Sequence, residues 1–103
     1  RLIAQSQAER DAAWLLCLRA ATLKDHGQPL TQQASMSKVY CTEMAGRVCQ
    51  RAVRGLGAIG HHSSCEAERL MRDVRVMRIY EGTSEIQRFV IAREELKKLR
   101  SGR

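Results

Sequence analysis

The apolar positions of the chain recur at helical spacing, and the first such segment covers residues 1–25. Its recurring apolar side chains are Ala12, Leu15, Leu16 and Leu23. Intervals of three and four residues place side chains on one face of a helix. Gly27 followed by Pro29 is typical of a helix end and the turn after it. The pattern therefore predicts a first helix over residues 1–25.

Two further helical segments follow this turn. Thr31 is a residue type suited to a helix N-cap, so a second helix is predicted from Thr31 to about Arg54. Small residues on its apolar face let another helix pack closely; they are Ala34, Cys41, Ala45, Val48 and Ala52. A third helix is predicted over residues 65–80, "CEAERLMRDVRVMRIY".

The third segment is broken at "EGT", and a last helix is predicted from about residue 84 to 100. Ser84 and Gln87 have the spacing of a capping box at its start. Its apolar face consists of Ile86, Phe89, Val90 and Leu96. With strand-favouring residues sparse throughout, the chain is predicted to be a single all-α domain over residues 1–103, part of an antiparallel up-and-down bundle.

Composition supports the helical interpretation. The 103 residues are 44% hydrophobic and contain one Pro and only four aromatic residues. No apolar run approaches the ~20 residues that a membrane span needs, so no membrane association is predicted. Because the chain begins at Arg1 without an initiator Met, we expect it to be a piece of a longer polypeptide.

Residues 55–60, "GLGAIG", match the dinucleotide-binding pattern G-x-G-x-x-G. That pattern binds a dinucleotide when a strand precedes it and a helix follows it. Here a long predicted helix precedes it, so the match does not indicate a nucleotide-binding βαβ unit. The glycines instead predict a turn between two helices.

Four cysteines are spread along the chain without a C-x-x-C pair. We interpret them as reduced thiols that serve as small apolar residues. The one arguable ligand cluster is His61, His62 and Cys65, which lacks a fourth ligand at a useful spacing. No metal site is predicted.

Glu81 is the candidate with chemical interest. It lies at the predicted helix break, between Tyr80 and Gly82. A carboxylate in such a place can project into a cleft and act as a general base. An ordinary exposed loop acid is the alternative, and the spacing alone favours that alternative.

Residues 69–94, "RLMRDVRVMRIYEGTSEIQRFVIARE", resemble the C-terminal signature of the acyl-CoA dehydrogenase family, "ERLMRD…IYEGT…IQR…AR". Residues 12–48 are similar to the family's paired helices, which carry "RAA…D.G…ASMAK…E.A". The resemblance covers essentially the whole chain. It implies the family's C-terminal antiparallel four-helix bundle, incomplete at its N-terminus, where the first helix of the bundle is missing.

The resemblance implies FAD-dependent oxidation of an acyl-CoA thioester to a trans-2-enoyl-CoA. Glu81 matches the base that removes the α-proton while the β-hydrogen leaves as hydride to the flavin. Tyr80 would line the acyl pocket, and Gly82 would let the backbone approach the ligand. Thr83 and Glu85 match positions that contact FAD in relatives, although several relatives carry Gln where this chain has Glu85.

The resemblance also assigns a place to the Gly-rich turn. Relatives carry Q-x-x-G-G-x-G-[YF] there and use it on the pyrophosphate of the adjacent subunit's FAD. In this chain Arg54 stands at the position of the Gln and His61 at that of the aromatic residue. The three glycine positions of the motif hold Gly57, Ala58 and Gly60. A guanidinium recognises phosphate bidentately. The turn is therefore interpreted as facing FAD, with an altered site or a purely structural connection as alternatives.

The net charge of +7 leaves three kinds of partner open: an acidic remainder of the protein, the phosphates of FAD and coenzyme A, and nucleic acid. The scarcity of aromatic residues disfavours stacking on single strands.

The partners that the resemblance implies are an acyl-CoA substrate, an electron-transfer flavoprotein and further copies in a dimer or tetramer. The compartment would be the bacterial cytoplasm or the mitochondrial matrix. We expect the 103-residue chain by itself to be inactive. The alternative functions are a non-catalytic DNA-binding protein and a protein that serves only in subunit assembly.

Overall fold

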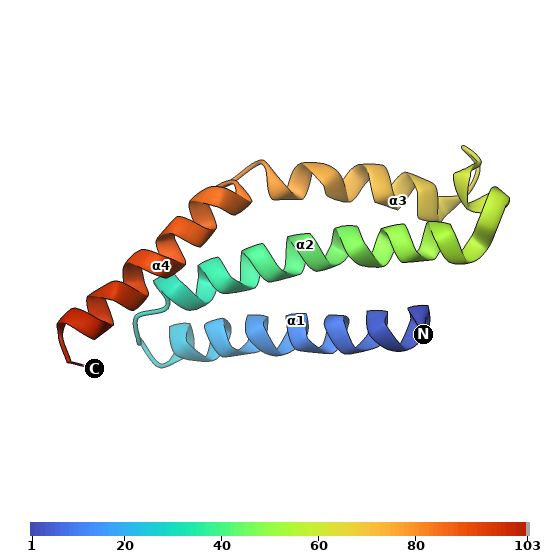
Figure 1. Ribbon diagram of the computed structural model, residues 1–103. Helices are drawn as coiled ribbons and strands as arrows, with labels where there is room; N and C mark the ends of the chain where they lie inside the picture. Colours follow the sequence, from blue (N-terminus) through green and yellow to red (C-terminus); the bar gives the residue numbers. More distant parts are fainter. Residues whose placement is uncertain (103) are drawn as a thin grey trace.

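The computed structural model describes residues 1–102 (Figure 1), a range that contains helices and no strand. The predicted all-α fold is confirmed. The elements in chain order are α1 (Leu2–Asp25), α2 (Thr31–Leu56), the 3₁₀ helix η1 (Gly57–His61), α3 (Glu66–Arg75), the 3₁₀ helix η2 (Val76–Arg78) and α4 (Ser84–Arg100).

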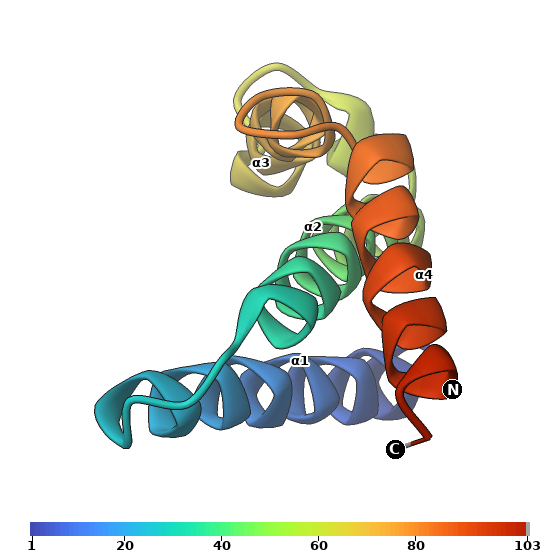
Figure 2. The ribbon, with the colours of Figure 1, turned by 90° about the vertical axis from the view of Figure 1, so that its left-hand side faces the viewer.

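Helix α2 is the central element, because it contacts α1, α3 and α4. The chain reverses direction between α1 and α2 and again between α2 and α3 (Figure 1). Helix α4 then continues in the general direction of α3, but at an angle to it, and passes over the N-terminal half of α2 (Figures 1 and 2). The bend between α3 and α4 therefore lies over the middle part of α2.

The turn after α1 ends the helix as predicted. Gly27 adopts a φ of 65°, which favours glycine. Its N–H donates to the carbonyl of Lys24 at 3.1 Å, and the N–H of Gln28 donates to the carbonyl of Leu23 at 2.9 Å. This pair of bonds is a Schellman motif, which satisfies carbonyls that the helix leaves free at its C-terminus.

The start of α2 differs from the prediction. Thr31 is the first helical residue, and Leu30 is the N-cap, without a side-chain bond. The helix also continues two residues beyond Arg54, to Leu56. The N–H of Ala34 bonds the backbone carbonyl of Leu30 at 2.8 Å. The first turn therefore closes through the backbone and does not need the Thr31 hydroxyl.

The start of α4 also differs, and the predicted capping box of Ser84 and Gln87 is wrong. Thr83 has extended backbone angles and is the N-cap, with its Oγ1 accepting from the N–H of Ile86 at 3.2 Å. This frees the Ser84 hydroxyl to bond Glu43 on α2, and Ser84 is buried there. The third predicted helix is divided in the structure, because α3 ends at Arg75 and the chain continues as the 3₁₀ helix η2 before the break.

The interior of the described chain is thin. Ala13 and Val53 are its buried apolar residues, whereas many large apolar side chains lie on the surface. Phe89, Ile86 and Trp14, for example, are more than half exposed. Large apolar side chains exposed in this number suit burial against further protein.

An ion-pair cluster joins α1 to α2. Glu9 accepts two bonds from the Arg51 guanidinium, at 2.5 and 3.2 Å, and one from Arg47 at 3.1 Å. The Glu9 side chain is only 12% exposed. The Arg51 hydrogen bonds, supported by the charge of Arg47, hold the pKa of Glu9 at about 2, against an ordinary value of 4.5.

A second contact between the same helices is made by two thiols. Cys17 Sγ and Cys41 Sγ lie 3.5 Å apart, and all four cysteines are free. Burial, together with the neighbouring Cys17, raises the pKa of the Cys41 thiol to about 11. Cys41 is therefore almost entirely protonated at neutral pH, in line with the interpretation of these cysteines as packing residues.

Candidate active site

The break between η2 and α4 holds four of the predicted site residues, at positions 80–83. Glu81 has a φ of +53° and is the one non-glycine residue with positive φ in residues 1–102. Gly82 follows with a φ of +98°. A left-handed conformation costs a non-glycine residue about 1–2 kcal/mol, so surrounding contacts must hold Glu81 in place.

Contacts from the middle of α2 hold this break. The Lys38 ammonium donates to the backbone carbonyls of Tyr80, at 2.7 Å, and Gly82, at 2.5 Å. Five residues further along α2, Glu43 accepts a 2.7 Å hydrogen bond from the Ser84 hydroxyl. Helix α2 thus contacts the segment both immediately around Glu81 and at the start of α4.

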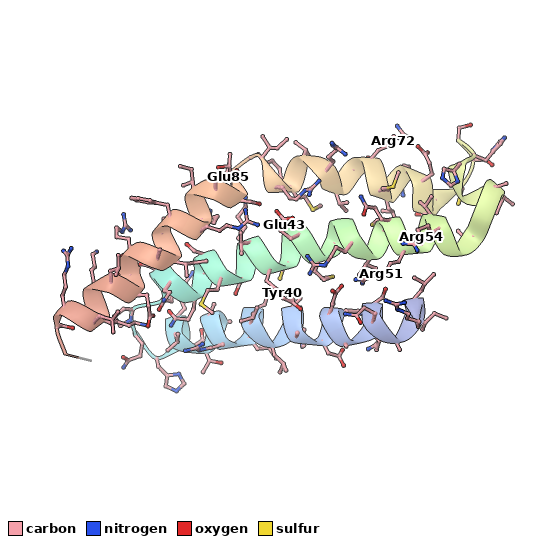
Figure 3. The ribbon with its side chains drawn as sticks, viewed as in Figure 1. Tyr40, Glu43, Arg51, Arg54, Arg72 and Glu85 are labelled. Carbon is pink, nitrogen blue, oxygen red and sulfur yellow. The ribbon has the colours of Figure 1, made fainter. Side chains whose placement is uncertain are left out.

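Glu43 also pairs with arginines from both sides of the break. Arg78 in η2 lies 3.4 Å from one carboxylate oxygen, and Arg88 in α4 lies 3.7 Å from the other. The Ser84 hydrogen bond and then Arg78 lower the pKa of Glu43 below its ordinary value. Figure 3 shows Glu43 on α2 beneath the junction of α3 and α4.

The functional groups of Glu81 itself are free. Its side chain is exposed, and neither its carboxylate nor its backbone N–H has a bonding partner among residues 1–102. Its carbonyl accepts a long bond, 3.4 Å, from the side chain of Gln87. Tyr80 beside it is 51% exposed. A carboxylate and an N–H donor of one residue are therefore both available to a ligand at the break.

The two remaining predicted residues at this end have different surroundings. Thr83 uses its oxygen as the N-cap acceptor of α4, which leaves its hydroxyl hydrogen free to donate. Glu85 is exposed in the first turn of α4. A carboxylate near a helix N-terminus is favoured by the helix dipole.

The second predicted set lies where α2 ends. Arg54 and His61 line a groove of about 420 Å³ together with Arg47, Gln50, Arg51 and Val53. Gly57 has a φ of +68°, and open space surrounds the position of a Cβ there. A Cβ on Gly60 would collide with the carbonyl oxygen of Val53. The glycines therefore serve the turn conformation and its close approach to α2.

The charges in this groove suit an anion. Glu9 engages Arg47 and Arg51, whereas Arg54 forms no ion pair within residues 1–102. His61 directs Nδ1 to the carbonyl of Gly57 at 3.1 Å, which leaves its other ring nitrogen free. A guanidinium binds phosphate by two directed hydrogen bonds, and an imidazole N–H can donate a further one. Ala58 is exposed at the same turn.

The set of residues around Glu81 and the set around Arg54 lie far apart within one chain. Lys38, which marks the Glu81 end, and Arg54 are sixteen positions apart on α2, or about 24 Å at 1.5 Å per residue. Figure 3 shows Glu85 and Arg54 at opposite ends of the α3 segment. A ligand that reaches both sets must be extended, or the sets must belong to different ligands.

Much of the remaining positive charge is balanced within the chain. On α3, Arg69 pairs with Glu66 and Asp73, and Arg72 pairs with Glu68. Residues 1–102 contain no group of three His, Cys, Asp or Glu side chains placed to hold a metal ion. Within the same residues, no helix combines the length and the apolar character required to cross a membrane.

Residues 1–96 match the family model described as "Acyl-CoA dehydrogenase, C-terminal domain". The chain belongs to the acyl-CoA dehydrogenase family. It is 45% identical over 95 residues to the probable acyl-CoA dehydrogenase YngJ of Bacillus subtilis, covering 92% of this chain and 25% of that protein. It is also 45% identical over 91 residues to the mitochondrial short-chain specific acyl-CoA dehydrogenase of Rattus norvegicus, covering 88% and 22%.

The fold agrees with a solved acyl-CoA dehydrogenase. The structure of butyryl-CoA dehydrogenase from Megasphaera elsdenii superposes with a TM-score of 0.89 at 34% identity, covering 92% of this chain and 25% of that one. The chain thus spans about a quarter of the length of these relatives. The predicted domain type, the C-terminal helical bundle of acyl-CoA dehydrogenases, is confirmed.

Two residues of the site were not predicted from the sequence. Lys38 lies inside the "ASMSK" string that carries part of the family resemblance, and Glu43 lies five residues later. Nothing in the helical pattern distinguishes them from other charged residues of α2. Their role depends on contacts with residues about 40 positions later in the chain, which helical spacing alone does not indicate.

Proposed function

We propose that this domain is the C-terminal part of a flavin-dependent acyl-CoA dehydrogenase that oxidises an acyl-CoA thioester to a trans-2-enoyl-CoA, with Glu81 as the catalytic base. The observation that carries the proposal is the state of Glu81. Its carboxylate and N–H are both free, in a backbone conformation that costs energy and that α2 maintains. Strained, anchored positions of this kind cluster at active sites.

The proposed chemistry uses the two free groups of Glu81 together. The carboxylate removes the α-proton of the thioester, and the backbone N–H donates to the thioester oxygen. That hydrogen bond strengthens as the oxygen gains negative charge, which lowers the barrier to proton removal. FAD, when bound, supplies the acceptor for the β-hydrogen. Tyr80 lies against the acyl chain, and Gly82 lets the backbone approach the ligand.

The residues proposed to bind FAD come from two separate places, the start of α4 and the turn after α2. Thr83 and Glu85 face one flavin from the start of α4. Arg54, Gly57 and Ala58 present the turn after α2 to a pyrophosphate, with Arg54 as the charged donor. The separation of the two sets along α2 supports the proposal that the turn serves the FAD of an adjacent subunit. The free charge of Arg54 and the groove beside it support a role in binding an anion.

The partners follow from the same proposal. The exposed apolar side chains of α1 and α4 suit burial against further protein, as in a homodimer or homotetramer. An electron-transfer flavoprotein would receive the electrons. The compartment would be the bacterial cytoplasm or the mitochondrial matrix. Residues 1–102 by themselves form neither a complete flavin site nor a substantial core, so we propose that the isolated 103-residue chain is inactive.

The proposal is tested on the full-length protein that carries this domain. The purified protein is mixed anaerobically with straight-chain acyl-CoAs of increasing length, and flavin absorbance and the CoA products are followed by spectroscopy and mass spectrometry. Bleaching of the flavin together with a trans-2-enoyl-CoA product is expected for at least one substrate. Bound FAD that no acyl-CoA reduces, or a protein that retains no FAD, would contradict the proposal.

A further inference from the structure

The ammonium of Lys38 is bonded to the backbone on both sides of Glu81. It donates to the carbonyl of Tyr80 at 2.7 Å and to the carbonyl of Gly82 at 2.5 Å. The same ammonium lies 5.9 Å from the centre of the Tyr80 ring. Lys38 is on α2, more than forty residues away in sequence, so these contacts tie the break to the central helix.

These contacts act where the backbone most needs support. The left-handed conformation of Glu81 costs about 1–2 kcal/mol. The carbonyls at a helix break also lack the partners that a continuous helix would supply. Hydrogen bonds from a charged donor are about twice as strong as neutral ones, so two of them can hold the strained geometry. The Tyr80 carbonyl shares a peptide plane with the Glu81 N–H, so moving it would rotate that N–H. The Gly82 carbonyl lies in the peptide plane after Gly82, so its bond to Lys38 anchors the chain on the other side of Glu81.

Lys38 is not engaged elsewhere. It forms no ion pair with an acidic side chain within residues 1–102, whereas the second anchor, Glu43, pairs with Arg78 and Arg88. Glu43 bonds the two ends of the break, at Arg78 and Ser84, and within residues 1–102 it forms no hydrogen bond or ion pair with residues 80–82. Glu43 therefore holds the start of α4, and Lys38 holds the backbone around Glu81.

We propose that Lys38 is the positioning residue for the catalytic base: by holding the carbonyls of Tyr80 and Gly82, it fixes the directions of the Glu81 carboxylate and N–H. This inference rests on the proposed function. Lys38 touches neither the proton that is transferred nor the thioester, and acts through Glu81. Its effect therefore falls on the rate of the bound complex, because a displacement of about 1 Å in a reacting group can cost about a hundredfold in rate.

The substitution Lys38→Met removes the ammonium and keeps an apolar stem. In the full-length protein, at a temperature well below its melting temperature, we expect kcat per bound FAD to fall by about ten- to a hundredfold, with KM changed by less than about threefold. Lys38→Gln, which keeps a neutral donor but shortens the reach, provides a second variant if Lys38→Met does not fold. Lys38→Arg can donate to two carbonyls, and we expect it to retain most of the activity.

Two comparisons separate positioning from a purely structural role. In a Glu81→Gln background, adding Lys38→Met should cause little further loss of kcat, because both changes act on the same base. Lys24→Met, at an exposed lysine on α1, is the matched control and is expected to leave kcat and KM unchanged. Lys38→Arg rescue together with this non-additivity would support the inference.

The inference and the proposed function fail in different ways. If Glu81→Gln abolishes turnover but folded Lys38→Met and Lys38→Gln keep the unsubstituted kcat, the inference about Lys38 is wrong and the function stands. A full additive loss in the double variant would likewise overturn it. If Glu81→Gln turns over at the unsubstituted rate, Glu81 is not the base, and both proposals are wrong.

Discussion

The Ser84 hydroxyl at the start of α4 donates a 2.7 Å hydrogen bond to Oε1 of Glu43 in the middle of α2. Ser84 is 5% exposed, so this bond lies largely out of water. Arg78 and Arg88 bring positive charge to the same carboxylate from either side of the break. One acidic side chain of the central helix therefore joins η2, α4 and α2 at the point where the chain bends.

Removing this carboxylate is expected to destabilise the bend. Glu43→Ala leaves the Ser84 hydroxyl without its acceptor and the two arginines without their shared partner. After allowance for solvent around the arginines, we expect a loss of about 1–2 kcal/mol in the free energy of unfolding. Chemical denaturation of the full-length protein measures it. Glu66→Ala, at an exposed ion-pair residue on α3, is the control, and an equal loss in both variants would contradict the account.

The Glu9 cluster is expected to make stability depend on pH in the acid range. The folded-state pKa of Glu9 is lowered from 4.5 to about 2, so its stabilising effect is fully present above about pH 5. It is lost as the pH falls toward 2, because the folded form then takes up the proton. Glu9→Gln should therefore lower the melting temperature at pH 7 and reduce its fall between pH 5 and pH 3. If the melting temperatures of the two proteins fell by the same amount between pH 5 and pH 3, the predicted role of Glu9 in the pH dependence would be contradicted.

Arg54 is expected to contribute to FAD retention. It is the free guanidinium in the groove at the end of α2, so Arg54→Ala should raise the FAD dissociation constant about tenfold, the effect of losing one charge-assisted contact. Arg54→Gln, which keeps hydrogen-bond donors without the charge, should restore part of the affinity. Titration of apoprotein with FAD, followed by flavin fluorescence, measures both. An Arg54→Ala protein that binds FAD as the unsubstituted protein does would favour a purely structural turn.

Local pattern was sufficient to predict the helices but not the contacts between them. The Gly27 stop and the break at Gly82 were visible in the sequence, because glycine there marks a backbone that other residues rarely adopt. The cap of α4 was misplaced by one residue, since Thr83 and Ser84 are both capable N-caps. Only the distant contact from Ser84 to Glu43 shows which hydroxyl is needed elsewhere.

The candidate site shows the same limit. Glu81 was predicted because the family resemblance covers its segment, whereas spacing alone favoured an ordinary loop acid. Lys38 had no local signal, since its two acceptors are backbone carbonyls and leave no trace in residue type. The predicted length of the second helix did not show how far Arg54 lies from Glu81, because the place of Glu81 along α2 depends on the contact with Lys38.

The central claim, that Glu81 removes the α-proton, is tested most directly by the rate of flavin reduction in Glu81→Gln. The full-length variant is mixed with saturating acyl-CoA in a stopped-flow instrument. The control is Glu66→Gln, a variant at an exposed glutamate of α3, measured in the same way. General-base catalysis contributes about a hundred- to ten-thousandfold, so a rate lower by that factor is predicted for Glu81→Gln at unchanged FAD content, with Glu66→Gln unaffected. A Glu81→Gln protein that reduces its flavin at the unsubstituted rate would contradict the claim.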